Sequence, residues 1–141
     1  MLGYSFDGKQ NSVPALAVLL ALAACATTAE IESEPLEAGV RRTFSGEFDE
    51  VVLAAVEAIR QNDLELEGYG EVDAGTWMIT AMTGTSARGW GSIVRIVIQR
   101  QSEDETFVRV LTRRRVARNV TAEDDYSAAI FSRMEILLAK Q

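Results

Sequence analysis

The feature that most limits the possible folds is a pair of segments, 93–100 and 106–116, separated by the polar sequence QSEDE. Apolar and polar residues alternate within both segments, which is typical of β-strands with one buried face. A single antiparallel register brings apolar residues together on one face and sorts the arginines to the other, so the sequence predicts a β-hairpin. This register pairs Ile98 with Val108, Ile96 with Val110, Val94 with Thr112, Arg95 with Leu111, Val97 with Arg109 and Ile93 with Arg113.

The segments around this hairpin predict an α+β fold. Apolar residues recur at helical spacing in 48–61 and again from about 122 to 139, which indicates two amphipathic helices. Segments 40–45, 64–72 and 76–83 have strand patterns. The order β-α-β-β-β-β-α therefore predicts a two-layer sandwich, in which an antiparallel sheet of four to five strands carries two helices on one face.

The N-terminal region contains an apolar run, VPALAVLLALAA, that spans residues 13–24 and ends at Cys25. As a helix this run would be about 18 Å long, too short for a hydrocarbon core of roughly 30 Å. Its length suits the apolar region of a secretory signal peptide. The alternatives are an uncleaved signal anchor and a buried amphiphilic helix that ends in a free thiol.

The end of this run, Leu22-Ala23-Ala24-Cys25, resembles the lipobox of bacterial lipoprotein precursors. In that family a signal peptidase cuts before the cysteine, whose thiol carries a diacylglycerol. The resemblance implies that residues 1–24 are a signal peptide, that cleavage falls between Ala24 and Cys25, and that acyl chains on Cys25 anchor the protein to a membrane. Ala26 follows in place of aspartate, which in this family implies the outer membrane, facing the periplasm, if the organism has two membranes.

After Cys25 the sequence ATTAEIESEPLEA fills residues 26–38 with small, acidic and proline residues and shows no helical or strand periodicity. This composition favours a solvated chain. We therefore expect residues 25–38 to form a lipidated N-terminus with an acidic tether, and residues 39–141 to form the globular domain.

The element order of the domain, with a turn at Asp73-Ala74-Gly75, resembles two groups of proteins. One group comprises small helix-grip-like envelope lipoproteins of unknown function. The other is the BamC-type accessory lipoprotein of the outer-membrane β-barrel assembly machine. The similarity covers roughly residues 40–139, and it implies a role in the cell envelope without assigning catalytic residues.

The composition excludes several classes of site. The chain has no histidine and one cysteine, so it lacks an internal disulfide, the commonest zinc ligand and the usual general base. Its net charge is −7, and from residue 39 onward 16 acidic and 13 basic side chains leave −3, which gives no general attraction to nucleic acid. We expect no enzyme, no metal and no cofactor, because no catalytic constellation can be assembled.

The arginines of the hairpin are the most conspicuous candidate site. Beside Phe107 and Leu111 they form a surface suited to a carboxylate, a phosphate-bearing glycan or an acidic protein. The alternative is a solvated face that is balanced by glutamates of the neighbouring hairpin. The arginines are Arg95, Arg109, Arg113 and Arg115, and the glutamates are Glu65, Glu67 and Glu71.

A second candidate is the glycine-rich segment 84–91, GTSARGWG, which carries Arg88 and Trp90. Loops on a rigid scaffold often contact partners, although Trp90 is equally suited to cover an edge of the core. Together these features predict a membrane-anchored, non-catalytic binding or accessory domain whose partner is another envelope protein. The alternative function is a carrier that encloses a small or lipidic ligand between helices and sheet, which would require an apolar cavity there.

Overall fold

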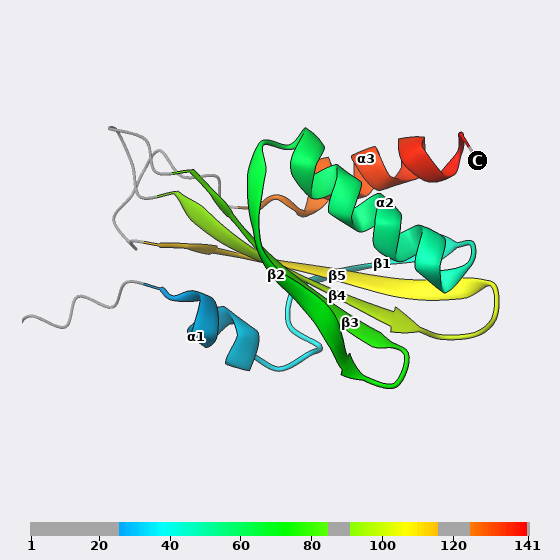
Figure 1. Cartoon of the computed structure of the whole chain (residues 1–141), viewed down its shortest axis with the longest axis horizontal. Helices are drawn as coiled ribbons and strands as arrows, with labels where there is room; N and C mark the ends of the chain where they lie inside the picture. The colour runs from blue at the N-terminus through cyan, green and yellow to red at the C-terminus, as the bar shows by residue number, and fades with distance from the viewer. Residues whose placement is uncertain (1–25, 85–90, 116–124, 141) are drawn as a thin grey trace, which may run out of the picture.

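The computed structural model describes residues 26–84, 91–115 and 125–140 (Figure 1). This part of the chain has the predicted α+β architecture, preceded by one additional helix. The elements are α1 (Thr28–Ser33), β1 (Val40–Ser45), α2 (Phe48–Gln61), β2 (Leu64–Asp73), β3 (Thr76–Thr83), β4 (Ser92–Arg100), β5 (Glu105–Arg114) and α3 (Ser127–Leu138).

The five strands form one antiparallel sheet in the order β1-β5-β4-β3-β2. The β4–β5 hairpin has the predicted register at all six predicted pairs. Central strand β4 is buried from Ser92 to Ile98, because α2 and α1 pack against its opposite faces. The alternating pattern therefore predicted the register correctly, even though both faces of β4 are buried.

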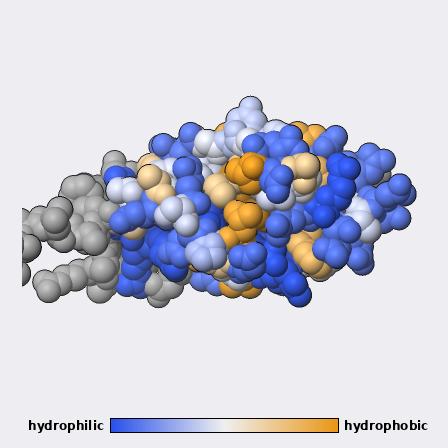
Figure 2. Space-filling view, turned by 90° about the horizontal axis from the view of Figure 1, so that it is seen from below, coloured by the Kyte–Doolittle hydropathy of each residue, from blue (hydrophilic) through white to orange (hydrophobic). Residues whose placement is uncertain are grey.

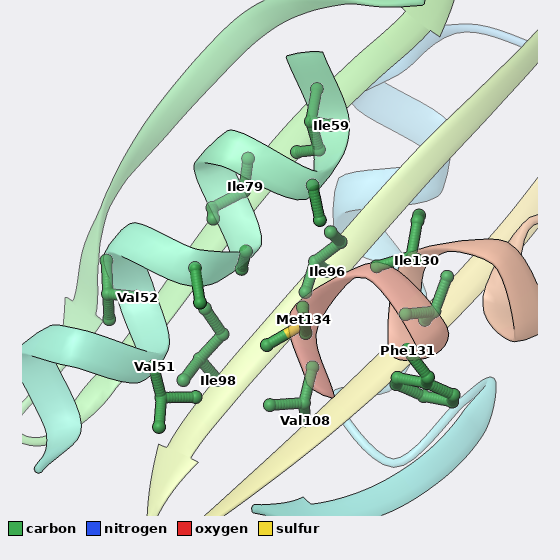
Figure 3. Close-up of a cluster of buried hydrophobic side chains, with 14 of the residues drawn as sticks. Val51, Val52, Ile59, Ile79, Ile96, Ile98, Val108, Ile130, Phe131 and Met134 are labelled. Carbon is green, nitrogen blue, oxygen red and sulfur yellow. The ribbon is translucent and has the colours of Figure 1, made fainter. Parts of the chain in front are cut away.

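Helices α2 and α3 lie side by side on one face of the sheet, as expected (Figure 1). Their apolar stripes point at the strands and at each other, as Figure 3 shows for Val51, Ile59, Ile130 and Met134 around Ile96. These side chains are at most 2% exposed. Burial of such apolar surface, at about 25 cal/mol per Å², is what holds the two layers together.

The start of α3 differs from the prediction. The helix begins at Ser127 rather than near residue 122, and Asp125 precedes it in a non-helical conformation. The carboxylate of Asp125 accepts hydrogen bonds from the N–H and the hydroxyl of Ser127, both at 2.8 Å. Asp125 thus satisfies one of the free N–H groups at the start of the helix.

The prediction of an extended tether over residues 26–38 is wrong. Thr27 and Glu30 form a reciprocal capping box that starts α1, and Ile31 packs against the sheet with 1% of its surface exposed. Figure 1 shows α1 on the face opposite α2 and α3. A helix of six residues with one large apolar side chain shows no periodicity, so its sequence resembles a polar linker.

Candidate interaction surface

The face of the sheet opposite α2 and α3, here called the second face, is ordered in four rows of side chains. The pairing of the strands defines these rows. From the β4–β5 turn onward they are Thr43, Phe107, Gln99, Thr76 and Asp73; then Arg41, Arg109, Val97, Met78 and Gly70; then Leu111, Arg95, Thr80 and Gly68; and then Arg113, Ile93, Met82 and Glu65. Helix α1 packs over the last two rows, the covered half, and leaves the first two rows as the open half.

Arg95 lies in the covered half and is fully buried. Its Nη1 donates hydrogen bonds to the carbonyls of Ile31, at 3.0 Å, and Glu34, at 2.6 Å, while Nη2 donates to the Pro35 carbonyl at 2.8 Å. The guanidinium thus caps the C-terminal end of α1, where carbonyl groups lack partners within the helix. The expected exposure of Arg95 at a binding surface is therefore wrong.

The burial of Arg95 also affects its ionisation. Removal of the guanidinium from water lowers its pKa, and the nearby carboxylate of Glu34 opposes this effect. An arginine nevertheless remains charged in proteins. The charge is held by backbone dipoles, with no carboxylate among its three described hydrogen-bond acceptors.

Arg113 and Arg115 lie at the end of β5 nearest the start of α1. Arg113 is exposed and forms an ion pair with Glu34 at 3.1 Å. Arg115 receives a backbone hydrogen bond from Ala26 at 2.9 Å and donates one to Gly91 at 3.0 Å. A pocket of about 400 Å³ adjoins Arg113, and the segment 26–35 provides its other lining residues, which are Ala26, Glu30, Ile31, Ser33, Glu34 and Pro35.

The glutamates expected to balance the arginines lie on β2, which β3 and β4 separate from β5. Among the described residues, the carboxylate that pairs with Arg113 instead belongs to Glu34, in the segment after α1. The two hairpins do adjoin through β3 and β4, but at Arg113 the balancing carboxylate comes from outside both hairpins. Arg113 of β5 and Glu34, the residue after α1, form this ion pair.

The open half combines aromatic and cationic side chains. The guanidinium of Arg41 lies 4.8 Å from the centre of the Phe107 ring, and Arg109 donates a hydrogen bond to Gln99. Phe107 and Met78 are half-buried, whereas Arg41 is exposed. Figure 2 views the molecule from the side of α1 and shows apolar groups surrounded by hydrophilic ones in the middle of this face.

Of the four predicted arginines, only Arg109 lies in the open half. Sequence reasoning missed Arg41. The segment 40–45 has only a weak strand pattern, and nothing in the sequence indicates which strand it pairs with. The pairing of Arg41 with Arg109 across β1 and β5 creates the surface. Enrichment in arginine and aromatic residues is typical of the buried centre of protein interfaces.

The space between the helices and the sheet is filled with buried side chains. Two further pockets lined by described residues lie elsewhere. One, of about 330 Å³, lies at the start of α2 beside Arg100, and one of about 260 Å³ lies over β2 and β3 beside Glu32. A carrier would require a cavity between the helices and the sheet, and none of these three pockets lies there.

The remaining predicted residues, Ala24, Cys25, Arg88 and Trp90, lie outside the described residues. Within the described ranges, no helix has the length and apolar character needed to cross a bilayer. The same ranges contain no group of three or more cysteine or acidic side chains placed to hold a metal ion. A scan against models of known protein families and a search of curated proteins each found no match for this chain.

Proposed function

We propose that this protein is a membrane-anchored lipoprotein whose folded domain binds an acidic surface of another envelope protein and performs no catalysis. The observation that carries this proposal is the open half of the second face, where Arg41 and Arg109 flank Phe107. Such a surface offers apolar area together with guanidinium groups that bind carboxylates in bidentate fashion. The resemblance of residues 22–25 to a lipobox supplies the membrane anchor and the envelope location.

The packing of α1 changes how the anchor would hold the domain. The N–H of Ala26 is already bonded to the domain, and α1 begins only two residues later. Acyl chains on Cys25 would therefore place the Arg113 end of the sheet at the bilayer without a spacer. Six residues separate Arg113 from Phe107, or about 20 Å of strand, so the open half would remain clear of the lipid and accessible to a partner.

The anchor is tested by the mass of the N-terminal peptide of the purified native protein. We expect a peptide that begins at Cys25 and carries diacylglycerol, and we expect Cys25→Ala to incorporate no labelled fatty acid. The physical reason is that only a thiolate offers the nucleophile for thioether formation at this position. A native peptide that retains residues 1–24 and carries no acyl group would refute the anchor.

The binding surface is tested by chemical crosslinking in intact envelopes. Phe107→Ala combined with Arg109→Glu should reduce the yield of the specific crosslinked product by about tenfold or more, because it removes an aromatic anchor and introduces like-charge repulsion. Leu53→Ala is the control, since Leu53 is exposed on α2, on the opposite side of the sheet. An unchanged yield in the double variant would exclude the open half as the binding surface.

A further inference from the structure

The two edges of the sheet differ in their suitability for pairing with another strand. Edge strand β2 has register shifts between Leu66 and Gly68 and between Glu71 and Asp73. Such irregularities discourage the addition of a strand. Edge strand β1 pairs with β5 without any shift over six consecutive residues, and all of its residues except Phe44 are exposed.

The backbone groups that β1 leaves open follow from the alternation of an antiparallel ladder. The N–H of Arg115 bonds to the carbonyl of Gly91, and that of Gln101 bonds to Glu105, so the odd-numbered residues of β5 face β4. Its even-numbered residues therefore face β1, in agreement with the bond from Gly46 N–H to the Asp104 carbonyl.

The same alternation assigns the groups of β1. Its even-numbered residues bond to β5, so the N–H and C=O groups of Arg41, Thr43 and Ser45 point away from the sheet. Among the described residues, no strand pairs with this side of β1. The edge therefore presents a regular row of donors and acceptors.

We infer that β1 binds an extended acidic segment of the partner protein, which adds to the sheet as a sixth strand. This inference rests on the proposed function and specifies the form of the partner. Main-chain hydrogen bonds would hold the added strand, while its side chains provide selectivity. Arg41 points to the second face, beside Arg109, and Arg42 points to the helical face, where it pairs with Glu135. A carboxylate on the second face of the added strand would thus meet Arg41, whereas Arg42 already has a carboxylate partner in Glu135.

The same charges argue against a second copy of this chain as the occupant. Antiparallel pairing of two β1 strands centred on Thr43 would place Arg41 of each copy opposite Ser45 of the other, so neither guanidinium would meet a carboxylate on the facing strand. The β2 strand of a second copy carries the two register shifts, which interrupt a continuous ladder. An acidic strand from another protein avoids both difficulties.

The test uses amide hydrogen exchange of the purified full-length protein with a synthetic peptide of alternating valine and glutamate as the probe. A saturating amount of the peptide should slow the exchange of the Arg41, Thr43 and Ser45 amides by about tenfold or more. A peptide of alternating valine and lysine is the charge control and should have no effect. Unchanged exchange with the acidic peptide, or equal protection by both peptides, would overturn the inference.

Two variants sharpen this test. Thr43→Pro removes a donor on the open side without removing a bond to β5, and proline is tolerated at such edge positions. It should abolish the protection of Arg41 and Ser45, whereas Thr43→Ala should preserve it. If Thr43→Pro fails to fold, the double variant Arg41→Glu with Arg42→Glu provides the test. This reversal of charge should make the lysine peptide, and not the glutamate peptide, slow the exchange of the β1 amides. Retained preference for the acidic peptide would contradict strand addition at β1.

The crosslinking yield separates this inference from the proposed function. Loss of the crosslinked product in the Phe107 and Arg109 variant, with full retention in folded Thr43→Pro, would overturn strand addition and leave the binding surface standing. Retention in both variants would overturn the proposed binding surface and, with it, this inference.

Discussion

Replacement of Arg95 by methionine should release α1 from the second face while the five-stranded sheet stays folded. The substitution leaves the carbonyl groups of Ile31 and Glu34 without a described donor, whereas the Pro35 carbonyl keeps its bond from the Ala38 N–H at 2.9 Å. A buried carbonyl left without a partner costs about 1–3 kcal/mol. Two such losses together match or exceed the roughly 1.5–3 kcal/mol contributed by burial of Ile31, so the segment should detach and become hydrated.

This release is measured by limited proteolysis within residues 26–38, for which we expect at least a tenfold increase in cleavage rate. The fold of the sheet is monitored separately by hydrogen exchange of β4 and β5, which should remain protected. Methionine is chosen because it retains an unbranched apolar side chain above Leu111 and Ile93. The effect on global unfolding is limited, because hydration of the freed carbonyls removes their penalty once α1 has left.

Arg113→Met is the matched control for this substitution. Arg113 belongs to the same face and interacts with the same segment, but its ion pair with Glu34 is solvent-exposed. Exposed ion pairs contribute about 0–1 kcal/mol, so the cleavage rate should change little. Equal release by both substitutions would mean that removal of any charge beneath α1 suffices, and our assignment of the buried cap to Arg95 would then be wrong.

Gly39→Ala should destabilise the whole domain by about 3 kcal/mol, through strain at the entry to β1. Gly39 has φ +107°, a conformation that residues with a side chain rarely adopt, and an added Cβ would lie 2.5 Å from the carbonyl oxygen of Val110. Relief of this overlap requires β1 to move away from β5. Equilibrium unfolding in urea measures the loss as a lower midpoint with an unchanged slope.

Gly70→Ala is the control, because an added Cβ there meets no atom within 4 Å. Gly70 also has no positive φ and lies on the edge strand β2. Reduced freedom of the unfolded chain should make this substitution neutral or stabilising by up to about 1 kcal/mol. A loss at Gly39 no greater than the change at Gly70 would show that the backbone around β1 relaxes without cost.

The Arg95→Met and Gly39→Ala substitutions both affect the interaction surface. The segment that joins α1 to β1 passes from the Arg95 cap through Gly39 to the edge strand. It therefore links α1, which lies over the covered half, to β1, which borders the open half. Strain at Gly39 should therefore weaken binding at β1 along with stability. The exchange rates of the Arg41 and Thr43 amides would report both effects.

The sequence by itself determined the α+β class, the two helices on one face of the sheet and the full register of the β4–β5 hairpin. It could do so because burial on one face leaves a period in the sequence, of two residues in a strand and 3.6 in a helix. The absence of histidine likewise limits the available chemistry through composition alone. The lipid anchor at Cys25 stays a prediction from the motif.

Only the tertiary structure decided which side chains of the second face are available to a partner. Periodicity assigned Arg95, Arg109 and Arg113 to the same face, but it carries no information about what covers that face. The cover proved to be a six-residue helix with one buried side chain, too short to leave a pattern. Arg41 joined the surface through pairing between residues 68 positions apart in the chain, because strand order depends on contacts that no local sequence window contains.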